Sequence, residues 1–536
     1  MQAGRPTGPR GRILVGMDTL TLAQLADGLR NAGIQVELAA PAGTATSTAG
    51  LAVTGAACDS RAVRAGDVFV CKGAAFRPAF LASARDAGAA AYLCAADKHA
   101  ELAAAVPELP ALVVAADDLR RAMAIVSAAA FGRPDREVPL VGITGTKGKT
   151  TCAYMLRSII DHARGEGRCG IIGTVATYDD IEDGASRNTT PEAPDLWRHL
   201  ANARDSRLDS LVMEVSSQAL KYDRSYGVEL ELACFLNIGL DHISAVEHKD
   251  FADYFGSKLR IFEQCRQAVV NLDSDHVDEI LASAEAGSAK KVLTFGLERR
   301  DAYAWASDLQ TSELGVSFTL HLGDEARAAS LPFPGDFSVS NALCAAVCAE
   351  QLGLNIDQIV NGLAVTRVPG RMEFYRSADG LLTGVVDYAH NRMAFDSLLS
   401  AVKKSFAGAR LIAVFGAVGG KAVERRHDLP EVAAQYVDHI VLTTDDPWTE
   451  DPADICRQME ESLPEGFSHE TVLDREEAAA RAFGLAAESC GRGEHAVVLL
   501  LAKGSDATQH VANGYAPVET DSSLAARLVT AYDARA

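Results

Sequence analysis

The chain has 536 residues, with 51 Lys and Arg against 72 Asp and Glu, which gives a formal net charge of −21. This length exceeds what one hydrophobic core organises, so several domains are expected. The acidic balance argues against nucleic acid as a partner, but it allows a nucleotide bound at one local cationic site. The sequence holds no apolar run near the ~20 residues that span a bilayer, so we expect no membrane insertion.

The 11 cysteines are scattered and form no Cys-x-x-Cys pair. This usage is typical of reduced thiols, so we expect a cytoplasmic protein. Cys344 and Cys348 lie one helical turn apart in an Ala-rich segment, which indicates core packing. Residues 1–18 are rich in Gly, Pro and Arg without the apolar stretch of a signal peptide, and we expect a disordered tail there.

From about Thr19 to Pro134, short apolar strands alternate with Ala-rich helices. Residues 67–70 and 90–93 are predicted strands, and residues 80–87 a helix. The polar segment Asp59-Ser60-Arg61 precedes them, and taken alone it is a surface turn. Residues 131–134, Phe-Gly-Arg-Pro, are predicted to be a linker to the next domain.

The stretch from Leu140 to Thr151 has the pattern strand, glycine loop, helix. An apolar strand leads into Gly145 and Gly148, and Lys149-Thr150 opens a helical apolar pattern. Backbone N–H groups and the helix N-terminus suit phosphate oxygens, Lys149 reaches the outer phosphates, and the Thr150 hydroxyl can hold Mg²⁺. The strict P-loop has Gly where Ile143 stands, so this is a variant loop, and the alternative is a plain glycine-rich turn. The predicted ATP-binding residues of the loop are Gly145, Thr146, Lys147, Gly148, Lys149, Thr150 and Thr151.

Polar side chains also follow two predicted strands of the same unit. Glu214 follows the strand 211–213, and residues 237–242, which end in Asp241-His242, follow the strand 233–236. Ligands of parallel sheets bind at the carboxyl ends of strands, and a carboxylate and an imidazole beside a phosphate loop suit Mg²⁺. Glu214 and His242 are therefore predicted metal ligands.

The last unit begins near Phe374 and again alternates strand and helix. Its predicted strands are residues 385–387, 411–415, 440–442 and 497–501. Polar loops follow three of them, at residues 387–391, 445–448 and 503–506. These loops are where a ligand of this unit is expected.

The variant glycine loop, Glu214-Val-Ser-Ser and the Asn237 to His242 motif resemble those of the Mur ligase family. Asp59-Ser60-Arg61 followed by Gly66-Asp67-Val68-Phe69 is similar to the N-terminal signature of its MurE type. The resemblance implies an α/β fold with the three-domain Mur ligase architecture: a central P-loop parallel-sheet ATPase domain and a C-terminal Rossmann-like domain. The implied boundaries are 1–18 for the tail, 19–135 for the UDP-sugar domain, 136–373 for the ATP domain and 374–536 for the amino-acid domain.

The resemblance also implies residue roles. Lys149, Glu214, His242 and Lys258 are the implied catalytic residues. Lys258 is implied to be carbamylated, so that it can hold a second Mg²⁺, and the implied metal ligands are Thr150, Glu214, His242 and Lys258. Further implied ATP contacts are Asn271, Asn341, Arg371 and Asp387, with Asn341 just before a helix from Ala342 to Leu352. The implied UDP-sugar contacts are Ser60, Thr189, Thr190, Ser216 and Arg224. The implied amino-acid contacts are Asp445, Asp446, Pro447, Trp448 and Asp506.

The implied reaction is ATP-dependent ligation, through an acyl phosphate, of an amino acid to the D-glutamate of UDP-N-acetylmuramoyl-L-alanyl-D-glutamate in peptidoglycan synthesis. We expect the protein to be a monomer, and its expected partners are its substrates. Diaminopimelate-adding enzymes carry Asp-Asn-Pro-Arg where this chain has Asp445 to Trp448. Trp448 offers no charge to a second carboxylate, and Asp446 suits an ammonium, so the resemblance implies L-lysine as the acceptor amino acid.

Several alternatives stay open. L-Ornithine is one methylene shorter than lysine, and meso-diaminopimelate is the other main amino acid of the MurE type. Sister enzymes such as MurF or folylpolyglutamate synthase share the ATP core, and Gly419 to Ala422 departs from the Gly-Asp-Arg-Asp of MurE. A non-catalytic nucleotide-binding regulator is an alternative of another class, against which the presence of Lys149, Glu214 and His242 argues.

Overall fold

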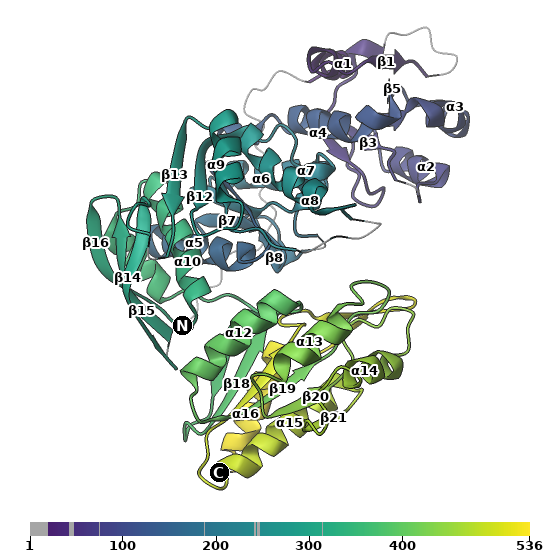
Figure 1. The fold of residues 1–536 in the computed structure, drawn as a ribbon. Helices are drawn as coiled ribbons and strands as arrows, with labels where there is room; N and C mark the ends of the chain where they lie inside the picture. The colour runs from purple at the N-terminus through teal and green to yellow at the C-terminus, as the bar shows by residue number, and fades with distance from the viewer. Residues whose placement is uncertain are drawn as a thin grey trace, which may run out of the picture. The chain divides into compact units, whose positions relative to one another are not determined.

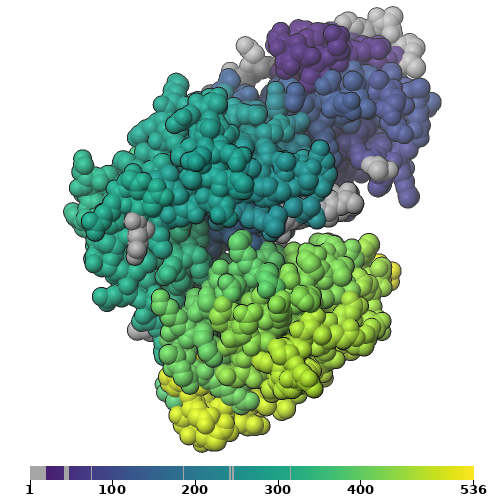
Figure 2. Space-filling model, viewed as in Figure 1, coloured from purple at the N-terminus to yellow at the C-terminus, as the bar shows by residue number. Residues whose placement is uncertain are grey.

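The computed structural model describes residues 20–41, 48–73, 75–186, 188–240, 243, 247–297, 299–313 and 315–535. The predicted tail, and His242 among the predicted ligands, lie outside these ranges. The chain divides into two compact units. Figures 1 and 2 draw the chain coloured by residue number from the N-terminus to the C-terminus. Unit 1 is Met1–Pro134, Glu192–Ala201 and Tyr222–Gly227, and unit 2 is Asp135–Pro191, Asn202–Lys221 and Val228–Ala536.

Unit 1 is built on a sheet of strand order β1-β5-β4-β3-β2. Strands β2 to β5 pair in parallel, and β1 is antiparallel at the edge. The strands predicted at 67–70 and 90–93 are confirmed as β3 and β4, and the predicted helix at 80–87 is α2. The elements are β1 (Val36–Ala39), β2 (Gly55–Ala57), β3 (Asp67–Val70), β4 (Ala91–Ala95), β5 (Ala111–Val114), α1 (Leu22–Asn31), α2 (Pro78–Asp86), α3 (Ala96–Ala105) and α4 (Leu119–Ala130).

The larger sheet of unit 2 has the order β16-β15-β14-β13-β12-β11-β6-β10-β7-β8-β9. Its middle strands are mostly apolar and almost entirely buried, as expected for parallel strands covered on both faces. The strands are β6 (Leu140–Thr144), β7 (Cys169–Ile172), β8 (Ala176–Tyr178), β9 (Asp183–Ala185), β10 (Ser210–Glu214), β11 (Leu230–Phe235), β12 (Cys265–Asn271), β13 (Lys291–Phe295), β14 (Ala304–Ser312), β15 (Gly315–Leu322) and β16 (Glu325–Leu331).

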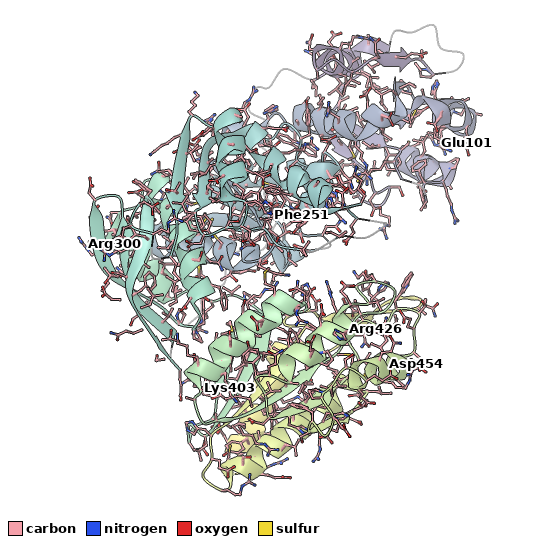
Figure 3. The ribbon with its side chains drawn as sticks, viewed as in Figure 1. Glu101, Phe251, Arg300, Lys403, Arg426 and Asp454 are labelled. Carbon is pink, nitrogen blue, oxygen red and sulfur yellow. The ribbon has the colours of Figure 1, made fainter. Side chains whose placement is uncertain are left out.

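The predicted parallel sheet is confirmed in its middle but not at its edges. Strands β14 to β16 and β7 to β9 pair antiparallel. In β14 and β15 buried and exposed residues alternate, because one face of these strands meets solvent. The helices of this part are α5 (Lys149–Arg164), α6 (Ala193–Asp205), α7 (Ser217–Lys221), α8 (Phe251–Leu259, whose first residue Figure 3 labels), α9 (Val277–Ala286), α10 (Asp336–Gln351) and α11 (Ile356–Ala364).

The expected helix start at Ala342 is wrong. Helix α10 begins at Asp336, directly after Pro334-Gly335, so Asn341 lies inside the helix and not before it. Gly335 adopts a φ of 109° and ends the preceding extended segment. The sequence analysis missed this start because the first turn lacks the apolar periodicity on which helix prediction relies.

The last part of unit 2 carries a sheet of order β17-β18-β22-β19-β20-β21 and a separate hairpin of β23 and β24. The four strands predicted here are confirmed as β18, β19, β20 and β22. The elements are β17 (Glu373–Arg376), β18 (Leu382–Asp387), β19 (Arg410–Phe415), β20 (His439–Leu442), β21 (His469–Thr471), β22 (Ala496–Leu501), β23 (Thr508–Val511), β24 (Gly514–Pro517), α12 (Arg392–Ser405), α13 (Arg425–Ala433), α14 (Pro452–Glu460), α15 (Arg475–Cys490) and α16 (Asp521–Asp533).

Helix α5, which follows the glycine loop, is held by close packing against α11. A Cβ built on Gly362 of α11 would lie 2.4 Å from the Cα of Ile159. The Ser158 hydroxyl also donates to the Gly362 carbonyl at 2.9 Å. The helix that positions the loop is therefore fixed by a contact that only glycine permits. Throughout the described ranges, no helix has both the length and the apolarity to cross a membrane.

Gly362→Ala should therefore destabilise the protein by about 1–3 kcal/mol, because the added methyl group forces α11 away from α5. Gly256→Ala is the matched control: Gly256 is exposed in α8 with no atom within 4 Å of its built Cβ. Alanine there should be neutral or stabilising by up to about 1 kcal/mol. Denaturant unfolding measures both changes, and equal effects of the two variants would contradict the packing argument.

Candidate active site

The glycine loop joins the end of β6 to the start of α5, as the sequence predicted. Gly148 has a φ of 85°, and a Cβ there would lie 2.3 Å from the Asn341 amide oxygen. Glycine is thus required both by the backbone and by the close approach of α10. The structure brings the predicted residue Asn341 to the loop despite its separation in sequence.

Two lysine side chains meet at one carbonyl oxygen of this loop. Lys149 Nζ donates to the Gly145 carbonyl at 2.8 Å and to the Thr146 carbonyl at 3.3 Å. Lys258 Nζ, from α8, donates to the same Gly145 oxygen at 2.9 Å. Lys258 is only 1% exposed, so its ammonium is held inside the protein. The predicted residues Lys149 and Lys258 are therefore neighbours, and they gather positive charge where the loop begins.

Glu214 lies at the end of β10, in parallel register with the last residues of β6. Its carboxylate accepts the Thr150 hydroxyl at 2.9 Å, the Thr174 N–H at 2.8 Å and the Thr174 hydroxyl at 3.1 Å. Glu214 is 1% exposed. Thr150 and Glu214 thus form one group of hard oxygen donors, while Thr174 is a supporting residue that the sequence analysis missed.

The loop after β11 fixes the glycine loop from the other side. The Lys147 N–H donates to the Asn237 Oδ1 at 2.9 Å, and the Asn237 amide donates back to the Lys147 carbonyl at 3.1 Å. The Thr146 N–H also donates to the Asn237 carbonyl at 3.0 Å. Asn237 was quoted within a motif but given no role in the prediction. The motif ends in His242, which lies outside the described residues.

Helix α8 is anchored so that Lys258 reaches the loop. Tyr254 Oη lies 3.0 Å from Thr146 Oγ1, and Lys258 Nζ lies 4.8 Å from the centre of the Tyr254 ring. Lys221 Nζ binds the Asp253 carboxylate at 2.6 Å, and this hydrogen bond lowers the pKa of Asp253. These contacts tie α8 to α7 and to the loop.

Two further groups of predicted residues are placed within unit 2. The Thr190 hydroxyl donates to the Glu214 carbonyl at 2.8 Å and accepts the Ser216 N–H at 3.1 Å, while Thr189 Oγ1 lies 3.0 Å from Thr174 Oγ1. Thr189, Thr190 and Ser216 therefore gather around the end of β10.

At the end of β12, the Asn271 amide donates to the Leu236 carbonyl at 2.8 Å. Asn271 thus braces the turn after β11.

Ser60 and Arg224 belong to unit 1. Ser60 lies in the turn after β2. Arg224 Nε lies 3.1 Å from Glu192 Oε1, and Lys72 Nζ lies 3.1 Å from the other oxygen of that carboxylate. Glu192 thus holds Arg224 and Lys72 on the same side of the unit.

Arg371 lies just before β17, and Asp387 is the last residue of β18, close enough for the two charges to interact. The Arg371 guanidinium lies 4.4 Å from the centre of the Tyr388 ring. The Asp387 carboxylate accepts the N–H groups of Met372 at 2.9 Å and Ala389 at 2.7 Å. Burial raises the pKa of Asp387, and Arg371 opposes that shift. Asp387 therefore shapes the chain around Arg371.

Three carboxylates surround Lys503 after β20 and β22. Lys503 Nζ lies 2.8 Å from Asp446 and 3.7 Å from Asp445, and it is 2% exposed. Burial raises the pKa of Asp506, Lys503 opposes this shift, and Asp446 and Asp445 add to it. Asp446 was expected to face a substrate ammonium directly, but in the structure its Oδ1 accepts Lys503 and the His510 N–H.

Trp448 lies in an aromatic stack that sequence reading missed. Its ring stacks on His510 of β23 with centroids 5.9 Å apart, and His510 stacks on Tyr515 of β24 at 4.7 Å. On Gly420, a Cβ would lie 2.2 Å from the Trp448 ring. The Gly420 N–H and Arg426, labelled in Figure 3, both donate to Glu450. The divergent glycine loop therefore accommodates Trp448.

The phosphate loop, its lysines and the carboxyl ends of a parallel sheet define a P-loop enzyme that uses a nucleoside triphosphate. Residues 143–349 match the model of the Mur ligase middle domain, and residues 370–504 match that of the Mur ligase, glutamate ligase domain.

Among named relatives, UDP-N-acetylmuramoyl-L-alanyl-D-glutamate--L-lysine ligase of Enterococcus faecalis is 34% identical over 95% of this chain and 98% of its own. The protein of the same name from Streptococcus thermophilus is 34% identical over 85% of this chain and 88% of its own. UDP-N-acetylmuramyl-tripeptide synthetase of Bifidobacterium longum is 36% identical over 75% of this chain and 78% of its own.

Solved structures of similar proteins have the same fold. The structure of a UDP-N-acetylmuramoyl-L-alanyl-D-glutamate--2,6-diaminopimelate ligase has a TM-score of 0.62 at 25% identity and covers 96% of this chain and 99% of its own. MurF of Acinetobacter baumannii, 20% identical over 96% of this chain and 100% of its own, shares the fold with a TM-score of 0.65. The chain belongs to the Mur ligase family. It is accordingly an ATP-dependent ligase that forms a peptide bond between an acid and an amino acid.

Proposed function

We propose that this enzyme adds L-lysine to the D-glutamate of UDP-N-acetylmuramoyl-L-alanyl-D-glutamate during peptidoglycan precursor synthesis in the cytoplasm. The observation that carries the ligase chemistry is the meeting of Lys149 and Lys258 at the Gly145 carbonyl, beside the Thr150–Glu214 pair. The L-lysine ligases among the relatives support the substrate. The reaction needs no protein nucleophile, and the proposal assigns none.

The chemistry has two steps. An oxygen of the D-glutamate carboxylate attacks the γ-phosphorus of ATP, ADP leaves, and an acyl phosphate forms. The amine of the incoming amino acid then attacks the acyl carbon, and phosphate leaves with that oxygen. Both steps spread negative charge over phosphate oxygens, which Lys149 and the backbone N–H groups of residues 145–151 stabilise.

Mg²⁺ fits the oxygen donors of this site. The Thr150 hydroxyl and the Glu214 carboxylate lie together at 2.9 Å, and such hard donors are the ones that Mg²⁺ prefers. We propose that these two residues hold the ion, with His242 as a further ligand. The ion would neutralise charge on the phosphates. The residues of this chain orient the donors, through Thr174 on Glu214 and Asn237 on the loop.

Lys258 enters this proposal as a carbamate. An ammonium has no lone pair for a metal, whereas its neutral amine adds CO₂ and releases a proton, which gives an anionic carbamate with oxygen donors. Burial beside Tyr254 and the loop excludes water from the modified group. Carbamylation would also replace one of the two positive charges at the Gly145 carbonyl by a negative one.

The other predicted site residues have binding roles in this proposal. Asn271, Asn341, Arg371 and Asp387 contact or position ATP. Ser60, Thr189, Thr190, Ser216 and Arg224 bind the UDP-sugar peptide. We propose a monomer whose domains end near the predicted boundaries 135 and 373.

Selection of the amino acid is proposed to depend on the loops after β20 and β22. Asp445, Asp446 and Asp506 surround the single ammonium of Lys503, so a further cation would meet an excess of negative charge there. The stack of Trp448, His510 and Tyr515 presents aromatic rings without a guanidinium for a second carboxylate. Asp445, Asp446, Pro447, Trp448 and Asp506 therefore favour a cationic amino acid.

Lys149→Ala should reduce ligation by ~10²-fold or more, because the variant loses charge stabilisation at the γ-phosphate. Its fold should survive, since the ammonium is bound to loop carbonyls and not to the core. The assay is phosphate release with ATP, the UDP-dipeptide and L-lysine. Near-normal ligation by a variant that unfolds like the parent would refute the assignment of the loop.

Lys258→Ala should be inactive and should recover part of its activity with formate or acetate, which supply the missing oxygen ligand. Lys290→Ala, at an exposed lysine of the same unit, should behave like the parent. With ¹³C-labelled CO₂, the parent and Lys290→Ala should show a carbamate carbon signal that Lys258→Ala lacks. A signal that is absent from the parent would rule out carbamylation.

In competition, the enzyme should form mainly the L-lysine tripeptide and little diaminopimelate product. L-Ornithine should be used more weakly, since one methylene discriminates by only ~1–3 kcal/mol. Trp448→Arg should shift the product ratio toward meso-diaminopimelate by adding a partner for its second carboxylate, whereas Tyr515→Arg, farther along the stack, should shift it less. A parent enzyme that prefers meso-diaminopimelate would overturn the choice of lysine without affecting the ligase assignment.

A further inference from the structure

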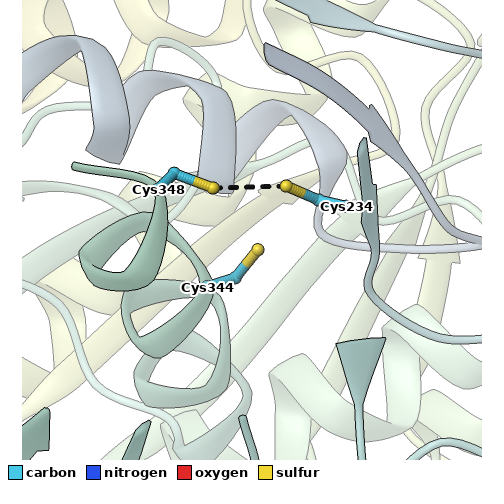
Figure 4. A group of neighbouring side chains, drawn as sticks. All are labelled: Cys234, Cys344 and Cys348. Carbon is cyan, nitrogen blue, oxygen red and sulfur yellow. Dashed lines mark hydrogen bonds between the residues drawn. The ribbon is translucent and has the colours of Figure 1, made fainter. Parts of the chain in front are cut away.

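Three cysteine side chains meet between β11 and α10 (Figure 4). Cys234 is on β11, and Cys344 and Cys348 face it from successive turns of α10. All three are fully buried, and their sulfur atoms lie within 4.8 Å of one another. Cys234 Sγ and Cys348 Sγ are in direct contact at 3.2 Å. The sequence had indicated core packing for the pair on α10, because it could not place Cys234 beside it.

The surroundings of the three thiols shift their pKa values in different directions. They lie in an apolar cluster with Ile143 and Leu343. Burial raises the pKa of the Cys344 thiol. Hydrogen bonds from Cys234 and from Cys344 lower the pKa of the Cys348 thiol. These directions favour the thiolate, the reactive form of cysteine, at Cys348 over Cys344.

We propose that Cys234 and Cys348 are a modification site, which forms a reversible disulfide between β11 and α10 when the enzyme meets a peroxide. The Cys348 thiolate attacks one peroxide oxygen, the O–O bond breaks, and the leaving oxygen departs as water after protonation. Cys348 is then a sulfenic acid. The Cys234 sulfur attacks it, the S–S bond forms, the S–O bond breaks, and a second water leaves. Two thiols are oxidised, and one peroxide is reduced to two waters.

A metal ion is the competing occupant of three cysteines, since thiolates bind soft cations. The geometry favours the disulfide, because one pair of sulfur atoms is already in contact at 3.2 Å. Charge favours it as well. A divalent ion on three thiolates would leave a net negative charge in an apolar core, whereas a disulfide is neutral.

The bond would act on the active site through the two elements it joins. Strand β11 leads into Asn237, which binds Lys147 of the loop, and α10 carries Asn341 against Gly148. The sulfur atoms must approach by about 1 Å to go from 3.2 Å to a bonded distance of about 2.05 Å, through side-chain rotation and a shift of β11 against α10. Misplacement of that size at a catalytic site lowers rates by up to ~10²-fold. The oxidised enzyme should therefore be slower until it is reduced.

The test uses the reduced full-length protein treated with hydrogen peroxide. After denaturation, a maleimide reagent should count two fewer free thiols than the 11 of the untreated chain. Peptide mapping should find Cys234 linked to Cys348, and dithiothreitol should restore both the thiols and the rate. Cys234→Ala and Cys348→Ala should not form the link, whereas Cys490→Ala, at a buried cysteine on α15, should form it as the parent does.

Peptide mapping of the parent decides the proposal even if the alanine variants fail to fold. A link between other cysteines, a thiol count that peroxide leaves unchanged, or Cys348 oxidised without a linked partner would each overturn it. Protection of the three thiols by added Zn²⁺, with no linked peptide after peroxide treatment of the metal-free protein, would identify a metal site instead. The thiol count is independent of the ligase reaction, so failure of the proposed function would leave this test intact.

Discussion

In the unmodified enzyme, the active site is arranged around two ammonium groups that share the carbonyl oxygen of Gly145. Like charges repel, so this arrangement persists only if the protein holds both side chains firmly. Lys149 follows directly from the loop, but Lys258 comes from a helix more than a hundred residues farther along the chain. The contacts of Tyr254 with Thr146 and of Asp253 with Lys221 fix that helix. Much of the site around the loop therefore holds one buried lysine in place.

The parts that the sequence predicted are those with a local signal. Apolar runs identified the middle strands, and the spacing of Gly145, Gly148 and Lys149 identified the loop. The parts it missed depend on contacts between distant segments. Asn237 and Thr174 support the loop through hydrogen bonds that no spacing predicts, and Cys234 meets α10 from another layer of the fold. The antiparallel edges were missed because half-exposed strands lack a continuous apolar run. The predicted role of His242 stays a prediction.

A single packing contact joins two sequence features in the last part of the chain. Trp448 stands where the resemblance places the arginine of diaminopimelate-adding enzymes, and Gly420 stands where it places the first Asp of Gly-Asp-Arg-Asp. The structure places the Trp448 ring where a Cβ on Gly420 would lie, so the two changes belong together. His510 and Tyr515 extend the same aromatic surface from a hairpin that sequence reading did not detect. Trp448 is thus one member of a stack of aromatic side chains, and not an isolated substitution in a loop.

The central claim, that the P-loop activates a carboxylate as an acyl phosphate, is tested most directly by following oxygen. The D-glutamate carboxylate of the UDP-dipeptide is labelled with ¹⁸O, and the phosphate released during ligation with L-lysine is analysed by mass spectrometry. The account predicts that each phosphate carries one oxygen atom from the carboxylate, because the oxygen that attacks the γ-phosphorus leaves with it. Release of unlabelled phosphate, with formation of the tripeptide, would contradict it.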